Sequence, residues 1–426
     1  MRIAHVTDCY LPRMGGIERQ VQGLATAQLA AGHQVSVITS VPSPSVPDAD
    51  GPDADGPAAD GPAADGPIVD GPATDGPAAD GPAADGPAAD GPTADGPVVI
   101  RPAGPGSRPG SIRYLSSLRG RQAVVTGGYD LVHVHASTFS PMAYLAAGAA
   151  SRSGVPTVAT LHSLWSYATP IFRGFDAALD WRRWPITWTA VSTAAAGALS
   201  QVLRPGTEIA VLPNGVRPEL WRLPRAPRDP QRVVIVSVMR LSARKRPLQL
   251  LKVLRAVRDL VPAGIGIEAQ IIGAGPQRDT MLSYLARHRM TGWVELTGQL
   301  DQPAIRDRFA DADLYVSPAR LESFGIAALE ARCAGLPVLA FAGTGVSDFI
   351  EHGRDGLLVG SDDELTAALA ELACSPAARA ELAAAEHGNQ PGYTWDQVLL
   401  TCEQVYRRAF EQAGRPLPGA LATPVP

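Results

Sequence analysis

The feature that most constrains the fold is an alternation of short β-rich runs with helical segments, which occurs twice along the chain. Between the runs lie segments such as residues 16–32, where Ile17, Val21, Leu24 and Leu29 share one helical face. Strands of the first series are expected at residues 2–8, 34–40, 98–104, 130–136, 157–163 and 187–192, and strands of the second at 232–240, 268–275, 293–298, 313–319, 336–341 and 355–360. Two such series predict an α/β protein with two parallel, doubly wound sheets.

The proline-rich, polar segment "RPELWRLPRAPRDPQ" separates the two series. We therefore expect a first domain at residues 1–216, a linker at 217–231 and a second domain at 232–390, which suits a chain of 426 residues. We further expect a helix at 391–412 that returns to the first domain, and a disordered tail at 413–426.

Residues 48–97 contain a five-residue repeat, "ADGPA", with twelve Asp and no Lys or Arg. Gly and Pro make up 20 of these 50 residues, and bulky apolar residues are nearly absent, so the segment is expected to be a disordered acidic loop between two strands. A tolerated loop expansion is favoured over an interaction arm. Without this segment the net charge changes from −5 to +7, and a mildly basic folded part suits an anionic small molecule. No nucleic acid partner is expected.

Several protein classes are not indicated. The four cysteines are far apart in the sequence, with no Cys-x-x-Cys pair and no histidine cluster, so neither a disulfide framework nor a zinc site is predicted. The N-terminus enters a strand at once, and no apolar run approaches about 18 residues. We expect a cytoplasmic protein.

Candidate site residues follow the predicted strands, where ligands of open α/β sheets bind. Gly15 and Gly16 follow the first strand and open a helix, which suits an anion, although a tight turn alone explains them equally well. Arg240 and Lys245 follow the first strand of the second series and could clamp a diphosphate, although surface solvation is the commoner fate of such a pair. His162 ends a strand, where a lone histidine is more often structural than catalytic.

The stretch "IIGAGPQRD" superficially matches a dinucleotide fingerprint. Arg278 occupies the third glycine position and Pro276 interrupts the expected turn, so the match is weak.

The stretch "ESFGIAALE" sets Glu322 and Glu330 eight positions apart around a glycine. If a helix begins near Gly325, the two backbones lie up to about 12 Å apart. This distance is wide for a retaining glycosidase pair, whose carboxyl groups lie about 5–5.5 Å apart. It suits two contacts on one elongated ligand, with a phosphate at the amides of Phe324, Gly325 and Ile326 and hydroxyls on either side. Two solvated helix charges are a poor alternative because the flanking residues are apolar.

Taken in order, these motifs resemble the retaining GT-B glycosyltransferases of family 4 (group 1). The resemblance rests on "MGGIERQV", "VHVHAS", "TLHS", "VLPNGV", "VMRLSARK", "IIGAGP", "ESFGIAALE", "GLPVLA" and "GRDGLLV", and covers nearly the whole chain outside the repeat and the tail. It implies two Rossmann-like domains that face each other across a cleft.

The resemblance also implies roles for these residues. Gly15 and Gly16 would approach the phosphates and the transferred sugar of a nucleoside diphosphate sugar. Arg240 and Lys245 would neutralise the diphosphate, and Phe324, Gly325 and Ile326 would meet it through their backbone. The three other candidates are His162 beside the reaction centre, Glu322 on the sugar hydroxyls and Glu330 on the ribose.

The implied reaction transfers a hexose or N-acetylhexosamine, with retained configuration, to a hydroxyl acceptor. That acceptor would be a glycolipid, a polysaccharide precursor of the cell envelope or a small polyol. A donor phosphate oxygen would help to deprotonate it, and no metal or other cofactor is expected.

Three alternatives to this function stay open: a nucleotide-sugar epimerase of the same fold, a dinucleotide oxidoreductase and a non-catalytic binding module. A separate hypothesis concerns residues 163–188, which hold four tryptophans together with arginines. This segment could contact the inner face of an anionic membrane or a lipid-linked acceptor, whereas ordinary packing of the first domain is the rival explanation.

Overall fold

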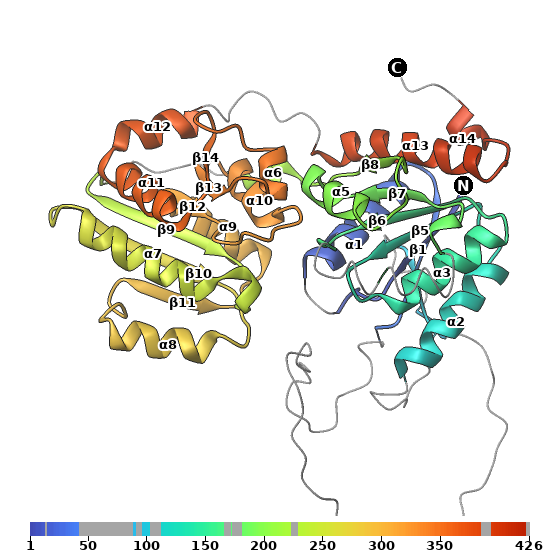
Figure 1. Ribbon diagram of the computed structural model, residues 1–426, viewed down its shortest axis with the longest axis horizontal. Helices are drawn as coiled ribbons and strands as arrows, with labels where there is room; N and C mark the ends of the chain where they lie inside the picture. The colour runs from blue at the N-terminus through green and yellow to red at the C-terminus, as the bar shows by residue number, and fades with distance from the viewer. Residues whose placement is uncertain are drawn as a thin grey trace, which may run out of the picture.

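The computed structural model describes residues 1–12, 15–41, 88–90, 96–102, 112–165, 172, 181–222, 229–384 and 393–422. These residues form two sheets, each with helices on both faces, that lie next to each other (Figure 1). Among these stretches we find no helix with the length and apolar character needed to span a bilayer.

The first sheet has the strand order β3-β4-β2-β1-β5-β6-β7-β8, and all its pairs are parallel except β3 with β4. Its strands are β1 (Arg2–Thr7), β2 (Gln34–Thr39), β3 (Ala88–Asp90), β4 (Val98–Arg101), β5 (Leu131–Ala136), β6 (Thr157–Leu161), β7 (Thr187–Ala190) and β8 (Ile209–Val211). The helices of this half are α1 (Gly16–Ala30), α2 (Ile112–Thr126), α3 (Pro141–Arg152), α5 (Thr193–Ser200) and α6 (Pro218–Trp221), with a 3-10 turn η2 (Trp181–Arg183).

The second sheet has the order β11-β10-β9-β12-β13-β14 and its pairs are parallel. Its strands are β9 (Arg232–Val238), β10 (Gly266–Ile272), β11 (Val294–Gly298), β12 (Leu314–Val316), β13 (Val338–Phe341) and β14 (Gly356–Val359). The helices are α7 (Pro247–Leu260), α8 (Arg278–Arg287), α9 (Gln302–Ala310), α10 (Ile326–Cys333), α11 (Asp362–Cys374) and α12 (Pro376–Ala384), with 3-10 turns η3 (Ala243–Lys245) and η4 (Gly345–Asp348).

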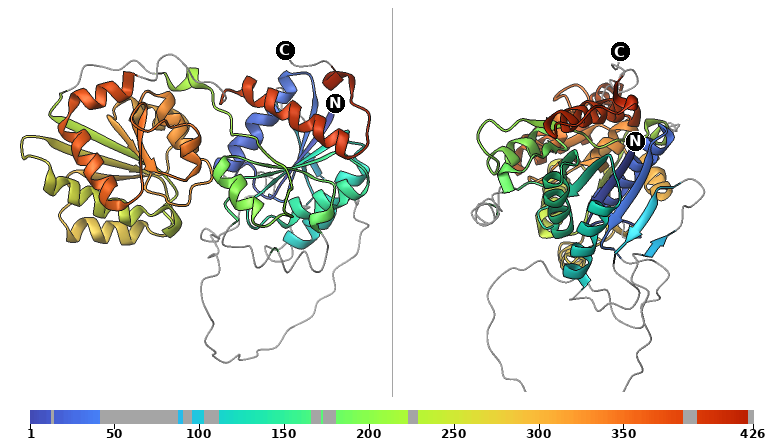
Figure 2. Two further views of the ribbon diagram at one scale, coloured as in Figure 1. Left: turned by 45° about the horizontal axis from the view of Figure 1, so that its top comes forward. Right: turned by 90° about the vertical axis from the view of Figure 1, so that its right-hand side faces the viewer.

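The last long helix, α13 (Trp395–Gln412), packs against α1, β6 and β7. Figure 2 shows this red helix lying over the first half of the molecule. Its apolar face explains this position, because Val398, Val405 and Phe410 are buried together with Ile3 and Leu131 of the first sheet. Thr394 caps the helix by accepting a hydrogen bond from the amide of Gln397.

Three expectations need correction. Residues 413–426 are not a disordered tail throughout, because α14 (Gly419–Ala422) follows α13 and Leu421 is buried against it. Residues 88–90 of the repeat form β3, which the neighbouring strand β4 stabilises, while 48–87 and 91–95 lie outside the described residues. The expected linker begins with α6, whose Trp221 is buried against Phe309 of the second half.

Candidate active site

The predicted site residues follow the carboxyl ends of four strands. Gly15 and Gly16 follow β1, His162 follows β6, Arg240 follows β9 and Glu322 lies in the loop after β12. In each sheet one of these strands marks the point where the strand order reverses: β1 lies between β2 and β5, and β9 lies between β10 and β12. Such reversal points are where open α/β sheets bind ligands.

The loop before α10 joins the two halves of the molecule. Ser323 donates a hydrogen bond of 2.7 Å from its hydroxyl to the carbonyl of His162, and the hydroxyl of Ser192 donates one of 2.5 Å to the carbonyl of Ser323. A methyl group built on Gly16 would lie 3.3 Å from Cδ1 of Ile326. The structure therefore brings the first turn of α1, the end of β6 and the start of α10 together.

Glycine is required at the start of α10. Gly325 has φ 92°, a left-handed conformation, and a Cβ atom there would lie 2.6 Å from Cγ2 of Val346. No side chain caps the helix at this residue, so the first amides of α10 keep their capacity to bind an anion. The side chain of Phe324 is 2% exposed and packs on Phe349 and Tyr393, so this residue can offer a ligand only its backbone.

Lys245 and Glu322 form an ion pair next to this helix start. The Lys245 Nζ lies 2.5 Å from Oε2 of Glu322, and the side chains are 29% and 14% exposed. Arg240 is exposed at the end of β9. The structure thus places one of the two predicted cations against one of the two predicted glutamates.

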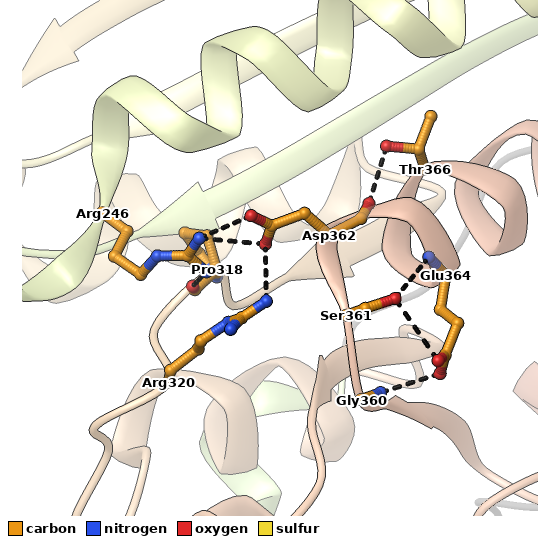
Figure 3. Close-up of polar contacts among 8 residues, drawn as sticks. All are labelled: Arg246, Pro318, Arg320, Gly360, Ser361, Asp362, Glu364 and Thr366. Atoms are coloured by element: carbon orange, nitrogen blue, oxygen red, sulfur yellow. Dashed lines mark hydrogen bonds and ion pairs between the residues drawn. The ribbon is translucent and has the colours of Figure 1, made fainter.

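Arg246 holds the loop that carries Glu322. Its backbone is left-handed (φ 61°) at the residue that precedes α7. The guanidinium donates to the carbonyl of Pro318 at 3.1 Å and to both oxygens of Asp362 at 2.7 and 3.0 Å, and Arg320 approaches the same carboxylate at 3.6 Å (Figure 3). The hydrogen bond from Arg246 lowers the pKa of Asp362, so the pair is fully charged near neutral pH. The Arg246 side chain therefore links the segment that carries Lys245 to the loop that carries Glu322 and to the first residue of α11.

Glu330 lies inside α10 and is 7% exposed. Burial raises the pKa of its carboxyl group to about 7, and the positive charge of Arg19 on α1 opposes this rise. A carboxyl group with this pKa changes its charge close to neutral pH.

His162 is linked to a second histidine. Its Nε2 lies 3.1 Å from Nδ1 of His135, which is fully buried on β5. Burial lowers the pKa of His162 to about 4, so its imidazole is neutral at pH 7.

The glycines of "IIGAGP" have a packing role. A Cβ atom on Gly273 would lie 1.8 Å from the carbonyl oxygen of Met239, and the amide of Leu241 donates to the carbonyl of Ala274 at 2.9 Å. The glycine turn therefore packs directly against the segment that carries Arg240. The turn thus has a structural explanation that requires no dinucleotide.

The tryptophans of residues 163–188 favour the packing explanation over membrane contact. Trp165, Trp181 and Trp188 are buried in the core of the first half, and Trp184 packs against Gly148 and lies 4.8 Å from the guanidinium of Arg152. Trp165, Trp181 and Trp188 are thus not available to a bilayer, whereas Trp184 is half-buried and Arg183 is exposed. Residues 166–171 and 173–180, with Arg173, lie outside the described part of the chain.

The sequence did not reveal four residues of this region: Arg19, Ser323, Arg246 and Asp362. Arg19 stands directly behind the glycines, in "GGIER", which was a usable signal. The other three act through partners that lie tens of residues or more away in the chain, so no local pattern identifies them.

Two protein-family models match successive parts of the chain. The model of the family described as "Glycosyltransferase Family 4" matches residues 14–220, and that of "Glycosyl transferases group 1" matches residues 223–386. The D-inositol 3-phosphate glycosyltransferase of Thermobispora bispora is 27% identical over 344 residues, which cover 73% of this chain and 78% of that protein.

Two solved structures share the fold. Sucrose-phosphate synthase from Thermosynechococcus elongatus has a TM-score of 0.67 at 19% identity, and the Anabaena protein HepE, in complex with UDP and glucose, has 0.66 at 18%. Each comparison covers 96% of this chain and 99% of the other. The predicted arrangement of two Rossmann-like domains is confirmed.

Proposed function

This chain belongs to the group 1, family 4 glycosyltransferases of the GT-B fold, and from that premise we propose that it moves a hexose or N-acetylhexosamine from a nucleoside diphosphate sugar to a hydroxyl acceptor, with retention of the anomeric configuration. The observation that carries this proposal is the Lys245–Glu322 ion pair beside the uncapped N-terminus of α10.

The diphosphate would bind at that N-terminus. Amides without intrahelical partners and the charge of Lys245 favour an anion there, and Arg240 lies at the end of β9. Since negative charge grows on the leaving phosphate as the glycosidic bond breaks, these groups would stabilise the transition state more than the ground state. Glu322, which already contacts Lys245, would hold the sugar hydroxyls next to the diphosphate.

The reaction breaks the bond between the anomeric carbon and the diphosphate oxygen, and forms a bond from the same carbon to the acceptor oxygen on the same face of the ring. The acceptor hydroxyl proton passes to an oxygen of the leaving phosphate, and the nucleoside diphosphate is released. In this scheme His162 positions the transferred sugar, Gly15 and Gly16 allow the ligand to approach the backbone, and Glu330 binds the ribose.

The neighbours suggest the first compounds to test. The Anabaena structure contains UDP and glucose, and the Thermobispora relative is named for D-inositol 3-phosphate. UDP-glucose is therefore the first donor to test, and UDP-N-acetylglucosamine and GDP-mannose extend the screen to other sugars and another nucleotide. Inositol phosphate, a polysaccharide precursor and a glycolipid represent the three acceptor classes.

The experiment combines thermal shift with product analysis. A donor at a hundred times its Kd should stabilise the protein by about 2.7 kcal/mol. Lys245→Ala should abolish this shift, while Lys252→Ala, which changes an exposed lysine on α7, should retain it. The anomeric proton of the product then reports the stereochemistry.

Three results would contradict the proposal in different ways. Conversion of the donor sugar without an acceptor would indicate an epimerase. A product with inverted configuration would refute retention. If no nucleotide sugar stabilised the protein, the proposed donor class would be wrong.

A further inference from the structure

Buried polar side chains form a continuous hydrogen-bonded chain beneath His162. They come from one face of the first sheet and from α1 and α13, which pack against the sheet. From His162 inward the links are His162 Nε2 to His135 Nδ1 (3.1 Å), His135 Nε2 to His5 Nδ1 (2.8 Å), and His5 Nε2 to Gln28 Oε1 (2.7 Å). Beyond Gln28 they are Gln28 Nε2 to Tyr406 (2.8 Å), Tyr406 to His133 Nδ1 (3.0 Å), His133 Nε2 to Thr160 (2.6 Å), Thr160 to Thr189 (2.6 Å) and Thr189 to the carbonyl of Ala159 (3.3 Å).

The Thr189 end of this hydrogen-bonded chain determines which atom donates in every hydrogen bond along it. The Ala159 carbonyl can only accept, so Thr189 donates to it and must accept from Thr160. Thr160 then accepts from Nε2–H of His133, whose Nδ1 must accept the hydroxyl proton of Tyr406. The oxygen of Tyr406 consequently accepts from the Gln28 amide nitrogen, which leaves the Gln28 carbonyl oxygen as an acceptor.

The same logic continues toward the candidate site. Gln28 Oε1 accepts from His5, so the proton of His5 is on Nε2 and its Nδ1 accepts from His135. His135 is then protonated on Nε2, and its Nδ1 accepts from Nε2–H of His162. A neutral His162 therefore has an unprotonated Nδ1.

The outer nitrogen of His162 is open to a ligand. No described residue hydrogen-bonds Nδ1 of His162, and this atom is not among the buried polar atoms of the described chain that lack a partner. Ser323, which precedes α10, binds the carbonyl of the same residue. A hydroxyl group donated by a ligand at the start of α10 therefore has an acceptor available.

The clustering of His5, His133 and His135 is better explained by the hydrogen-bonded chain than by a metal ion. Ring nitrogens of His5, His133 and His135 lie within 4.8 Å of one another, but both nitrogens of each ring already have a hydrogen-bond partner. Burial lowers the pKa of His5 to about 4 and, together with the neighbouring imidazoles, lowers the pKa values of His133 and His135 well below their ordinary value. The rings are thus neutral at pH 7, as the directed chain requires.

We propose that Gln28 and Tyr406 are positioning residues that hold His162 in its Nε2–H tautomer, so that Nδ1 accepts a hydrogen bond from a hydroxyl of the bound sugar. The identity of that hydroxyl rests on the proposed function, whereas the tautomer does not. The arrangement explains why a buried sheet face carries three histidines and two threonines, since each supplies one donor and one acceptor to the chain.

The first test is NMR spectroscopy of the complete protein labelled with 15N-histidine. Long-range correlations between ring protons and ring nitrogens distinguish a protonated from an unprotonated nitrogen. At pH 7, His162 should show a protonated Nε2 and an unprotonated Nδ1. A protonated Nδ1 on His162 would overturn the proposal, whatever reaction the protein catalyses.

The second test breaks the chain at His5 with two variants. Gln at position 5 can still donate to Gln28 and accept from His135, so His5→Gln should keep the tautomer of His162. His5→Leu cannot, so both tautomers of His162 should appear, and kcat should fall by about two- to tenfold, the range of one net hydrogen bond, with little change in the donor KM. If His162 kept a single Nε2–H tautomer in His5→Leu, the hydrogen-bonded chain would not control the tautomer of His162.

Tyr406→Phe gives a third measurement if His5→Leu does not fold. Without the Tyr406 oxygen the amide of Gln28 can turn over and donate to His5, so a protonated Nδ1 should appear on His162. If the tautomer responded as expected but no nucleotide sugar reacted even with the wild-type protein, the proposed function would fail and the positioning chain would stand.

Discussion

Replacement of Glu330 by Gln tests whether this buried carboxyl group is protonated in the folded protein. Burial on α10 raises the pKa of Glu330 from 4.5 to about 7, despite the opposing charge of Arg19. The folded state therefore keeps a proton that the unfolded chain loses above pH 4.5. The contribution of Glu330 to the free energy of unfolding is therefore fully present below pH 4.5 and is lost as the pH rises from 4.5 to 7.

The magnitude follows from the size of the shift. About 2.5 pH units correspond to about 3 kcal/mol at 1.4 kcal/mol per unit. Gln has nearly the same shape and does not titrate. The free energy of unfolding of Glu330→Gln should thus exceed that of the wild type by about 3 kcal/mol at pH 8 and by only about 1 kcal/mol at pH 5, apart from an offset that is the same at both pH values.

Urea unfolding at pH 5 and pH 8 measures this difference directly. Glu371→Gln, on the exposed face of α11, is the matched control and should show no pH-dependent gain. If the gain of Glu330→Gln were equal at the two pH values, the carboxyl group would already be ionised in the folded state and the argument from burial would be wrong.

The same titration should affect donor binding. A ribose hydroxyl donates to a carboxylate, so the donor should bind the deprotonated form of Glu330 preferentially. With a pKa of about 7, the donor Kd should rise about tenfold from pH 8 to pH 6. Isothermal titration calorimetry of Glu330→Gln should show a weaker donor affinity without this additional pH dependence.

Three further predictions concern neighbouring residues. Glu322→Ala should mainly lower kcat, by a factor that corresponds to about 2–4 kcal/mol, because contacts to the sugar tighten at the transition state, whereas Glu330→Ala should mainly raise the donor KM; steady-state kinetics with the reverse result would exchange the two assignments. Gly325→Ala should destabilise the protein by about 2 kcal/mol or more, since the left-handed backbone and the contact with Val346 both oppose a side chain, and an unchanged Tm would contradict this. Burial lowers the pKa of His5 to about 4, so the free energy of unfolding should fall by about 2 kcal/mol between pH 7 and pH 5, because the unfolded chain binds a proton there and the buried ring does not. In urea unfolding, His5→Gln should not show this loss.

The sequence predicted the parts of the site that depend on local pattern. The twelve expected strands are present, and α10 begins after Gly325, so Glu322 stands in a loop and Glu330 inside a helix as expected. Apolar periodicity and a glycine at a helix start are sufficient for such predictions. The roles assigned to the two glutamates stay predictions.

What the sequence did not predict depends on contacts between distant segments. The histidine chain requires His5, His162 and Tyr406 to meet from three elements, and no spacing along the chain indicates that they do. Arg246 likewise finds Asp362 more than a hundred residues away. The short edge strands β3 and β8 were not predicted, because pairing with the neighbouring strands β4 and β7 stabilises them and no local pattern indicates that pairing.

The position of α13 has a consequence for synthesis of the protein. The first sheet is complete once β8 has been made, but Ile3 and Leu131 remain uncovered until residues 395–412 emerge from the ribosome. At about 5–20 residues per second, about 200 residues of the second half take roughly 10–40 s to translate. Throughout this interval the nascent chain exposes an apolar surface, so it should be a client of chaperones that bind such surfaces, and a ribosome that stalls in the second half should leave an aggregation-prone fragment.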